Sequence, residues 1–246
     1  MLLMAVCLGM LSCSGRTEDT DMQPADGMVI TDRVLYRSES TDPDDCLTAE
    51  LVIENNQALL LQATDGTSTD RILINDRSYM TNLERADLDG DGTDEIVTHS
   101  CVNTLGGYFE SRIFRWEDGE LTELFRAAPG FDSGFRSAAS LEKKEGNLVL
   151  SFDAGSGPVA YAIGSRAGSL TDGDVTFWGT GSFIEFSCED PDGDGVYEVW
   201  GKEDCFVGCH LNVIGYAFSV WSYDPDRGEM IRTALWFEPV ERCGGQ

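Results

Sequence analysis

Short segments in which apolar and polar residues alternate recur along the whole chain. This alternation, together with β-branched and aromatic residues and intervening turn residues, is typical of strands. One stretch, FRSAASLEKKEG at 135–146, has helical character, over only about three turns. The sequence therefore predicts an all-β, mainly antiparallel protein, with strands in 49–55, 58–64, 71–76, 95–102, 110–116, 120–125, 147–152, 183–188, 196–201, 216–223 and 231–237.

The two halves of the chain follow one pattern. GGYFESRIFRWEDGELTELF begins at Gly106, and IGYAFSVWSYDPDRGEMIRTALWF begins at Ile214. Both contain Gly-Tyr, an alternating strand, an acidic turn closed by Gly-Glu, and a strand ending in Phe. Asp118-Gly119 also suits the positive φ angles of a tight hairpin turn. The pattern predicts two β repeats, at 37–132 and 133–246.

Each repeat contains an acidic loop with a glycine at its sixth position. The first loop is DLDGDGTDE at 87–95 and the second is DPDGDGVYE at 190–198. Alternate carboxylates around a sharp glycine turn converge on one point, and oxygen-only ligands of this kind favour Ca²⁺ over Mg²⁺ or Zn²⁺. The seventh residue can add a backbone carbonyl. The predicted Ca²⁺ ligands, at two sites, are Asp87, Asp89, Asp91, Thr93 and Glu95, and Asp190, Asp192, Asp194, Val196 and Glu198.

The spacing excludes an EF-hand, because position 12 is Thr98 in the first loop and Gly201 in the second. Strand-like sequence follows each loop where an EF-hand would have a helix. An acid at position 9 before an apolar strand resembles the FG-GAP or VCBS repeat family, which includes the calcium loops of integrin α propellers. The resemblance covers 83–97 and 186–200. It implies a β-propeller-like repeat in which a calcium hairpin loop joins two strands; a β-sandwich or two linked β units is the alternative.

The charge of the chain limits the classes of partner that it is expected to bind. Forty-four acidic residues oppose seventeen basic ones, for a net charge of −27. A phosphate-binding face needs clustered Lys and Arg, so the sequence excludes nucleic acid as the main partner. A strongly acidic surface favours cations and keeps an exported protein soluble.

The first residues have the pattern of an export signal. Residues 2–11 form an apolar run too short to span a bilayer, and the run ends in LSCSG, where the small residue Ser12 directly precedes Cys13. This resembles a bacterial lipobox, so we expect a signal at 1–13, lipid on Cys13 and an acidic tether at 14–36. Plain secretion is the alternative. An even number of further cysteines outside the cytoplasm predicts three disulfides, with unassigned pairing, among Cys46, Cys101, Cys188, Cys205, Cys209 and Cys243.

No catalytic motif is found, and the chain has only two histidines, His99 and His210. Cys205, Cys209 and His210 are spaced one residue wider than a c-type haem attachment motif, and we interpret these cysteines as disulfide partners instead. The expected function is therefore recognition or adhesion by an extracytoplasmic, membrane-anchored protein. Its partner would be a surface protein or glycan, with calcium structural. A secreted, glycan-active hydrolase with unassigned carboxylates is the alternative.

Overall fold

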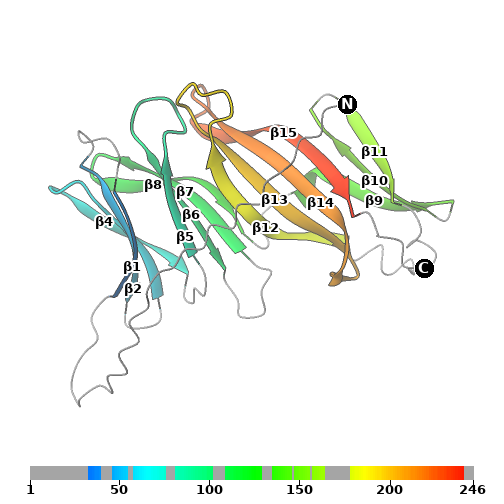
Figure 1. Cartoon of the computed structure of the whole chain (residues 1–246), viewed down its shortest axis with the longest axis horizontal. Coiled ribbons are helices and arrows are strands. Elements are labelled where there is room, and N and C mark those ends of the chain that lie inside the picture. The colour runs from blue at the N-terminus through cyan, green and yellow to red at the C-terminus, as the bar shows by residue number, and fades with distance from the viewer. Residues whose placement is uncertain are drawn as a thin grey trace, which may run out of the picture. The chain divides into compact units, whose positions relative to one another are not determined.

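The computed structural model is all-β and antiparallel, as predicted. It describes residues 33–39, 46–54, 58–75, 81–101, 109–128, 135–145, 147–155, 157–163 and 178–240, which all lie in the compact unit Thr31–Gln246. The strands form four separate sheets (Figure 1), and in each the strands follow one another as an antiparallel meander. Among these residues, no helix is long and apolar enough to cross a membrane.

The first half of the described chain supplies two four-stranded sheets. One contains β1 (Arg33–Glu39), β2 (Thr48–Glu54), β3 (Ala58–Thr64) and β4 (Thr69–Asn75). The other contains β5 (Thr81–Ala86), β6 (Glu95–Cys101), β7 (Phe109–Glu117) and β8 (Glu120–Ala127).

The second half of the described chain supplies a four-residue helix and two further sheets. The helix α1 (Phe135–Ala138) precedes a three-stranded sheet of β9 (Ala139–Lys144), β10 (Asn147–Asp153) and β11 (Pro158–Ile163). The last sheet contains the longest strands: β12 (Trp178–Glu189), β13 (Glu198–Val207), β14 (Cys209–Asp224) and β15 (Glu229–Pro239).

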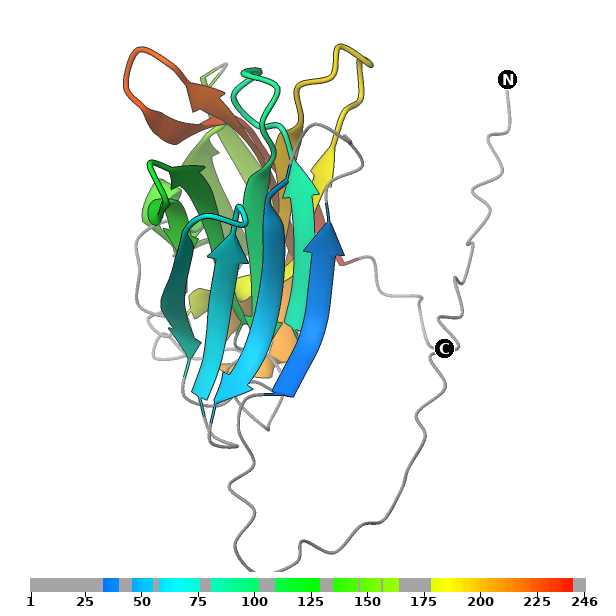
Figure 2. The same ribbon diagram turned by 90° about the vertical axis from the view of Figure 1, so that its left-hand side faces the viewer.

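The sheets do not pack in chain order. Neighbouring residues of β6 point to opposite faces, so Ile96 packs against β1–β4 while Val97 packs against β12–β15. The β9–β11 sheet packs against β12–β15 through a third cluster that includes Phe152 and Phe237. The packing order is therefore β1–β4, β5–β8, β12–β15, β9–β11, which Figure 1 shows along its long axis and Figure 2 shows from the β1–β4 end. Each meander resembles a propeller blade. The sheets do not pack in chain order, however, because β5–β8 contacts β12–β15 directly, although β9–β11 lies between them in the sequence.

One face of the β12–β15 sheet packs against two other sheets. Along β13 every second residue from Val199 to Val207 is buried, so these side chains share a face. Val199 belongs to the core shared with β5–β8, whereas Cys205 and Val207 belong to the core shared with β9–β11. Strands of 10 to 16 residues are long enough to accommodate both neighbours.

Several local expectations are corrected or completed by the structure. The predicted helical stretch is helical only at Phe135–Ala138, and Ala139 begins β9. The predicted tether ended at residue 36, but β1 already begins at Arg33; the rest of that tether and the expected signal lie outside the described residues. The hairpin turn is confirmed, with Glu117 paired to Glu120 and positive φ at Asp118 and Gly119.

Candidate metal centre

The two acidic loops have left-handed glycines at the same two positions. Each connects two antiparallel strands, β5 to β6 in the first and β12 to β13 in the second. The fourth and sixth residues are glycines with φ of 76° and 86° in the first loop and 75° and 91° in the second. Left-handed φ of this kind is readily adopted only by glycine, which explains why Gly occurs at both positions in each loop.

The hydrogen bonds within the loops also correspond. The first aspartate accepts from the glycine amides at positions 4 and 6, at 2.7 and 2.9 Å in the first loop and at 2.7 and 3.1 Å in the second. The third-position carboxylate accepts from the fifth-position amide, and the fifth-position carboxylate accepts from the seventh. These bonds hold the two loops in corresponding tight turns, as a compact cation loop requires.

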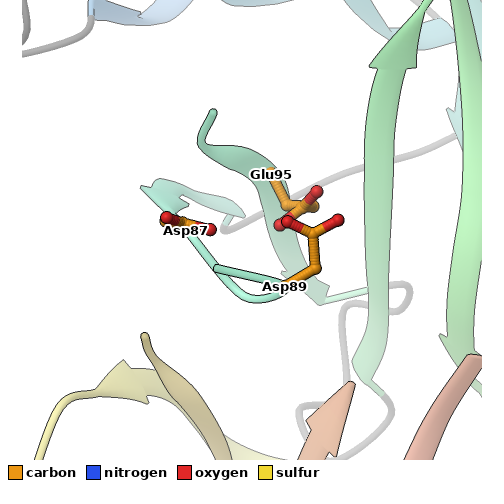
Figure 3. Close-up of side chains that lie close together, drawn as sticks. All are labelled: Asp87, Asp89 and Glu95. Carbon is orange, nitrogen blue, oxygen red and sulfur yellow. The ribbon is translucent and has the colours of Figure 1, made fainter. Parts of the chain in front are cut away.

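Three carboxylates converge in the first loop. Oxygens of Asp87, Asp89 and Glu95 all lie within 4.8 Å of one another, and Figure 3 shows the carboxylates of Asp89 and Glu95 next to each other. Oxygens that share a Ca²⁺ at 2.3–2.6 Å are within about 5 Å of each other, so this group could hold a metal ion. The pKa of Glu95 is raised to about 7, mainly by burial and in addition by the neighbouring charge of Asp89, while the hydrogen bonds from Leu88 and Arg115 lower it.

A guanidinium group already lies among these carboxylates. Arg115 of β7 forms ion pairs with Asp89 and, at 3.1 Å through Nε, with Oε1 of Glu95. Oε2 of Glu95 accepts a 2.9 Å hydrogen bond from the amide of Leu88. Both oxygens of this buried carboxylate therefore have partners. Sequence reasoning missed Arg115, since it lies 20 residues from Glu95 and only the pairing of β6 with β7 brings the two together.

The second loop gathers a different set of acids. Oxygens of Asp190, Asp192 and Asp194 lie within 4.8 Å of one another and could also hold a metal ion. Glu198 is outside this group, but its Oε2 is buried and has no hydrogen-bond partner among the described residues. Burial raises the pKa of Glu198, and so do its neighbours Asp192, Asp194 and Asp190. An unsatisfied buried carboxylate oxygen beside three acids is what a cation would complete.

The two loops therefore differ in which of the predicted ligands at positions 5, 7 and 9 lie in the carboxylate group. Asp91 lies in the first loop but outside its carboxylate group, whereas its counterpart Asp194 is inside the second group. At position 7, the backbone amides of Thr93 and Val196 each donate a hydrogen bond to the carboxylate at position 5 of the same loop. Glu95 is in its group and Glu198 is beside its own.

The two loops contact each other. The backbone amide of Tyr197 donates a 2.8 Å hydrogen bond to the backbone carbonyl of Asp87. A Cβ placed on Gly90 would lie 3.1 Å from Cγ2 of Val196, so the backbone of one loop packs closely on a side chain of the other. The two candidate metal centres therefore lie side by side where β5–β8 meets β12–β15.

Three of the six cysteines expected in disulfides have no disulfide partner in the described part of the structure. Cys46, Cys188 and Cys205 are free thiols, in contrast to the expected disulfides. Cys101 is buried at the end of β6. The side chains of Cys209 and His210, and all of Cys13 and Cys243, lie outside the described part of the structure, so the lipid, haem and remaining disulfide interpretations are not tested there.

Another glutamate with a raised pKa is far from the loops in the fold. Burial raises the pKa of Glu203, whose Oε1 accepts a 2.8 Å hydrogen bond from the amide of Phe135. It lies next to Cys205 on the buried face of β13, and Cys205 and Phe135 both belong to the core that β9–β11 shares with β12–β15. It therefore anchors the start of α1 and is not part of either acidic group.

Comparisons with known proteins returned no relatives. The chain matches no protein-family model, no curated protein sequence and no solved structure. The resemblance of the two loops to FG-GAP or VCBS repeats accordingly remains a prediction from those residues.

Proposed function

We propose that this chain is an exported calcium-binding β protein whose two acidic loops each take one Ca²⁺. The observation that carries the proposal is the orphaned Oε2 of Glu198 beside Asp190, Asp192 and Asp194. All available donors are oxygens, which suits Ca²⁺, and neither loop offers the His or Cys ligands that Zn²⁺ prefers. Asp190, Asp192 and Asp194, with Glu198 beside them, would hold the ion of the second loop; Asp87, Asp89 and Glu95 would hold that of the first.

The role of the ions in this proposal is structural. A cation in each loop neutralises carboxylates that otherwise repel one another, and the loops connect through the Tyr197–Asp87 hydrogen bond. An ion bound only by the folded state stabilises it by about 2.7 kcal/mol per site when free calcium is about a hundred times the dissociation constant. Calcium would therefore stabilise the packing of β5–β8 on β12–β15.

Calorimetric titration of the demetallated full chain tests calcium binding directly. We expect up to two Ca²⁺ ions to bind per chain. Asp190→Asn, which preserves the size and shape of the side chain, should remove the site of the second loop. Asp226→Asn, an exposed acid in the β14–β15 turn, is the matched control and should leave both sites unchanged. Mg²⁺ in place of Ca²⁺ should bind more weakly. Absence of binding by either ion would contradict the proposal.

The proposed cellular role is recognition or adhesion outside the cytoplasm, from a lipid anchor at Cys13. This part is supported by the apolar run at 2–11, the small residue before Cys13 and the strongly acidic composition. Metabolic labelling of the expressed full chain with a fatty acid tests the anchor: we expect label on the wild type and none on Cys13→Ser. Binding of the calcium-loaded protein to surface glycans and proteins, compared with binding after chelation, tests recognition.

A further inference from the structure

The residue opposite the position-9 glutamate differs between the two loops. On β6 and β7, Ile96 pairs with Phe114. Because the strands are antiparallel, the residue of β7 opposite Glu95 is Arg115. On β13 and β14, Val199 pairs with Trp221, so the residue at the same place beside Glu198 is Ser222. Paired residues of antiparallel strands project to the same face. A cationic side chain therefore faces the first loop where a small hydroxyl occupies the equivalent position beside the second.

Arg115 is held by groups from two sheets. Besides Asp89 and Glu95, its Nη1 donates a 3.2 Å hydrogen bond to the hydroxyl of Tyr223 on β14. The guanidinium carbon also lies 4.8 Å from the centroid of the Tyr223 ring, within the range of a cation–π contact. Displacing the guanidinium from the first loop would break all of these contacts.

The carboxylates of the two loops consequently differ in what they still need. In the first loop, Glu95 is 2 % exposed and has a partner for each oxygen. In the second loop, the charged neighbours that act on Glu198 are the acids Asp190, Asp192 and Asp194, and no described basic side chain pairs with them. A bound cation would therefore replace existing interactions in the first loop and supply missing ones in the second.

We propose that Arg115 is an internal cation of the first loop, so that the two loops bind calcium unequally: the second binds first and more tightly, and Ca²⁺ enters the first only in competition with the Arg115 guanidinium. This inference rests on the proposed calcium function. It makes Arg115 the residue that determines the affinity difference between two loops of otherwise matching sequence.

Reciprocal substitutions test this, with each loop measured alone in the full chain by calcium calorimetry. In the Asp190→Asn background, which leaves the first loop, Arg115→Ser should tighten Ca²⁺ binding about tenfold or more, because the competing charge is gone. In the Asp87→Asn background, which leaves the second loop, Ser222→Arg should weaken binding by a similar factor. Arg115→Ser in that second background is the control and should change the affinity less than about twofold.

The outcomes separate this inference from the proposed function. If neither loop of the wild type binds Ca²⁺, the proposed function fails. If both loops bind with equal affinity, and neither reciprocal substitution shifts it, the calcium function stands and the role of Arg115 is overturned. Should Arg115→Ser fail to fold by circular dichroism, Ser222→Arg decides alone, since it adds a side chain at a half-buried position and leaves every contact of Arg115 with its loop in place.

Discussion

The backbone amide of Tyr197 in the second loop donates to the backbone carbonyl of Asp87 in the first, across 2.8 Å. Asp87 also accepts the amides of Gly90 and Gly92 through its carboxylate, so one residue organises its own loop and receives the other. The two candidate metal centres are thus parts of one interface, although their first residues, Asp87 and Asp190, are more than a hundred positions apart in sequence.

This contact predicts that damage to the two loops is not additive. Asp87→Asn and Asp190→Asn should each lower the free energy of unfolding in calcium, and a double-mutant cycle should give a coupling energy of about 0.5 kcal/mol or more. Chemical denaturation of the four proteins in saturating calcium measures it. Strictly additive losses would mean that the loops act independently in spite of their contact.

Burial of His99 predicts acid destabilisation. Its ring stacks on Phe109 with centroids 4.8 Å apart, its Nδ1 lies 2.8 Å from Oγ of Ser111, and burial lowers its pKa to about 4. A histidine whose folded pKa lies below the unfolded value of 6.5 contributes stability above that value and loses it as the pH falls toward 4. The full contribution is about 3 kcal/mol.

The matched experiment compares wild type with His99→Gln, which has no titrating ring. Between pH 7 and 4 the wild type should lose more unfolding free energy than the variant, in chemical denaturation at each pH. Identical pH profiles would show that His99 is not protonated on unfolding in this range, and the carboxylates common to both proteins cancel in the comparison.

Gly215 on β14 is predicted to tolerate no side chain. A Cβ there would overlap the ring of Phe237 and the backbone carbonyl oxygen of Glu238, and a backbone atom cannot rotate away. Gly215→Ala should cost about 3 kcal/mol of unfolding free energy. Gly66→Ala is the control: its φ is +85° but the space is open, so strain alone should cost about 1 kcal/mol. Equal losses in thermal or urea unfolding would contradict the overlap.

The thiols should differ sharply in reactivity. Cys46 is exposed, whereas Cys205 is fully buried and burial raises the pKa of Cys188 to about 12. Because the thiolate is the reactive species, iodoacetamide at pH 8 should modify Cys46 in the native protein and reach Cys188 and Cys205 only after unfolding. Peptide mapping by mass spectrometry measures this. Recovery of disulfide-linked peptides that contain these three residues would instead support the bridges expected from the cysteine count.

Local patterns of residues were enough to predict the class of the fold and the positions of the two loops. Apolar runs bounded by turn residues located strands such as β3 and β10, in which buried residues alternate along the strand because one face packs on the core. The sequence pattern missed β1, β5, β9 and β11; TNLERA in β5 and ASLEKK in β9, for example, are mostly polar and do not alternate clearly. Their strand conformation depends on pairing with neighbours, which is a property of the assembled sheet.

The tertiary structure alone decided how those elements meet. The burial pattern of β13 predicts one buried face, but only packing shows that Val199 faces one sheet and Val207 another. The acids of each loop can be predicted from local spacing, because the candidate ligands lie within one short segment of the chain. Arg115 and the contact of Tyr197 with Asp87 do not, because they join residues 20 and more than 100 positions apart. Local sequence specifies the turn of the chain; strand pairing and sheet packing specify which charge enters it.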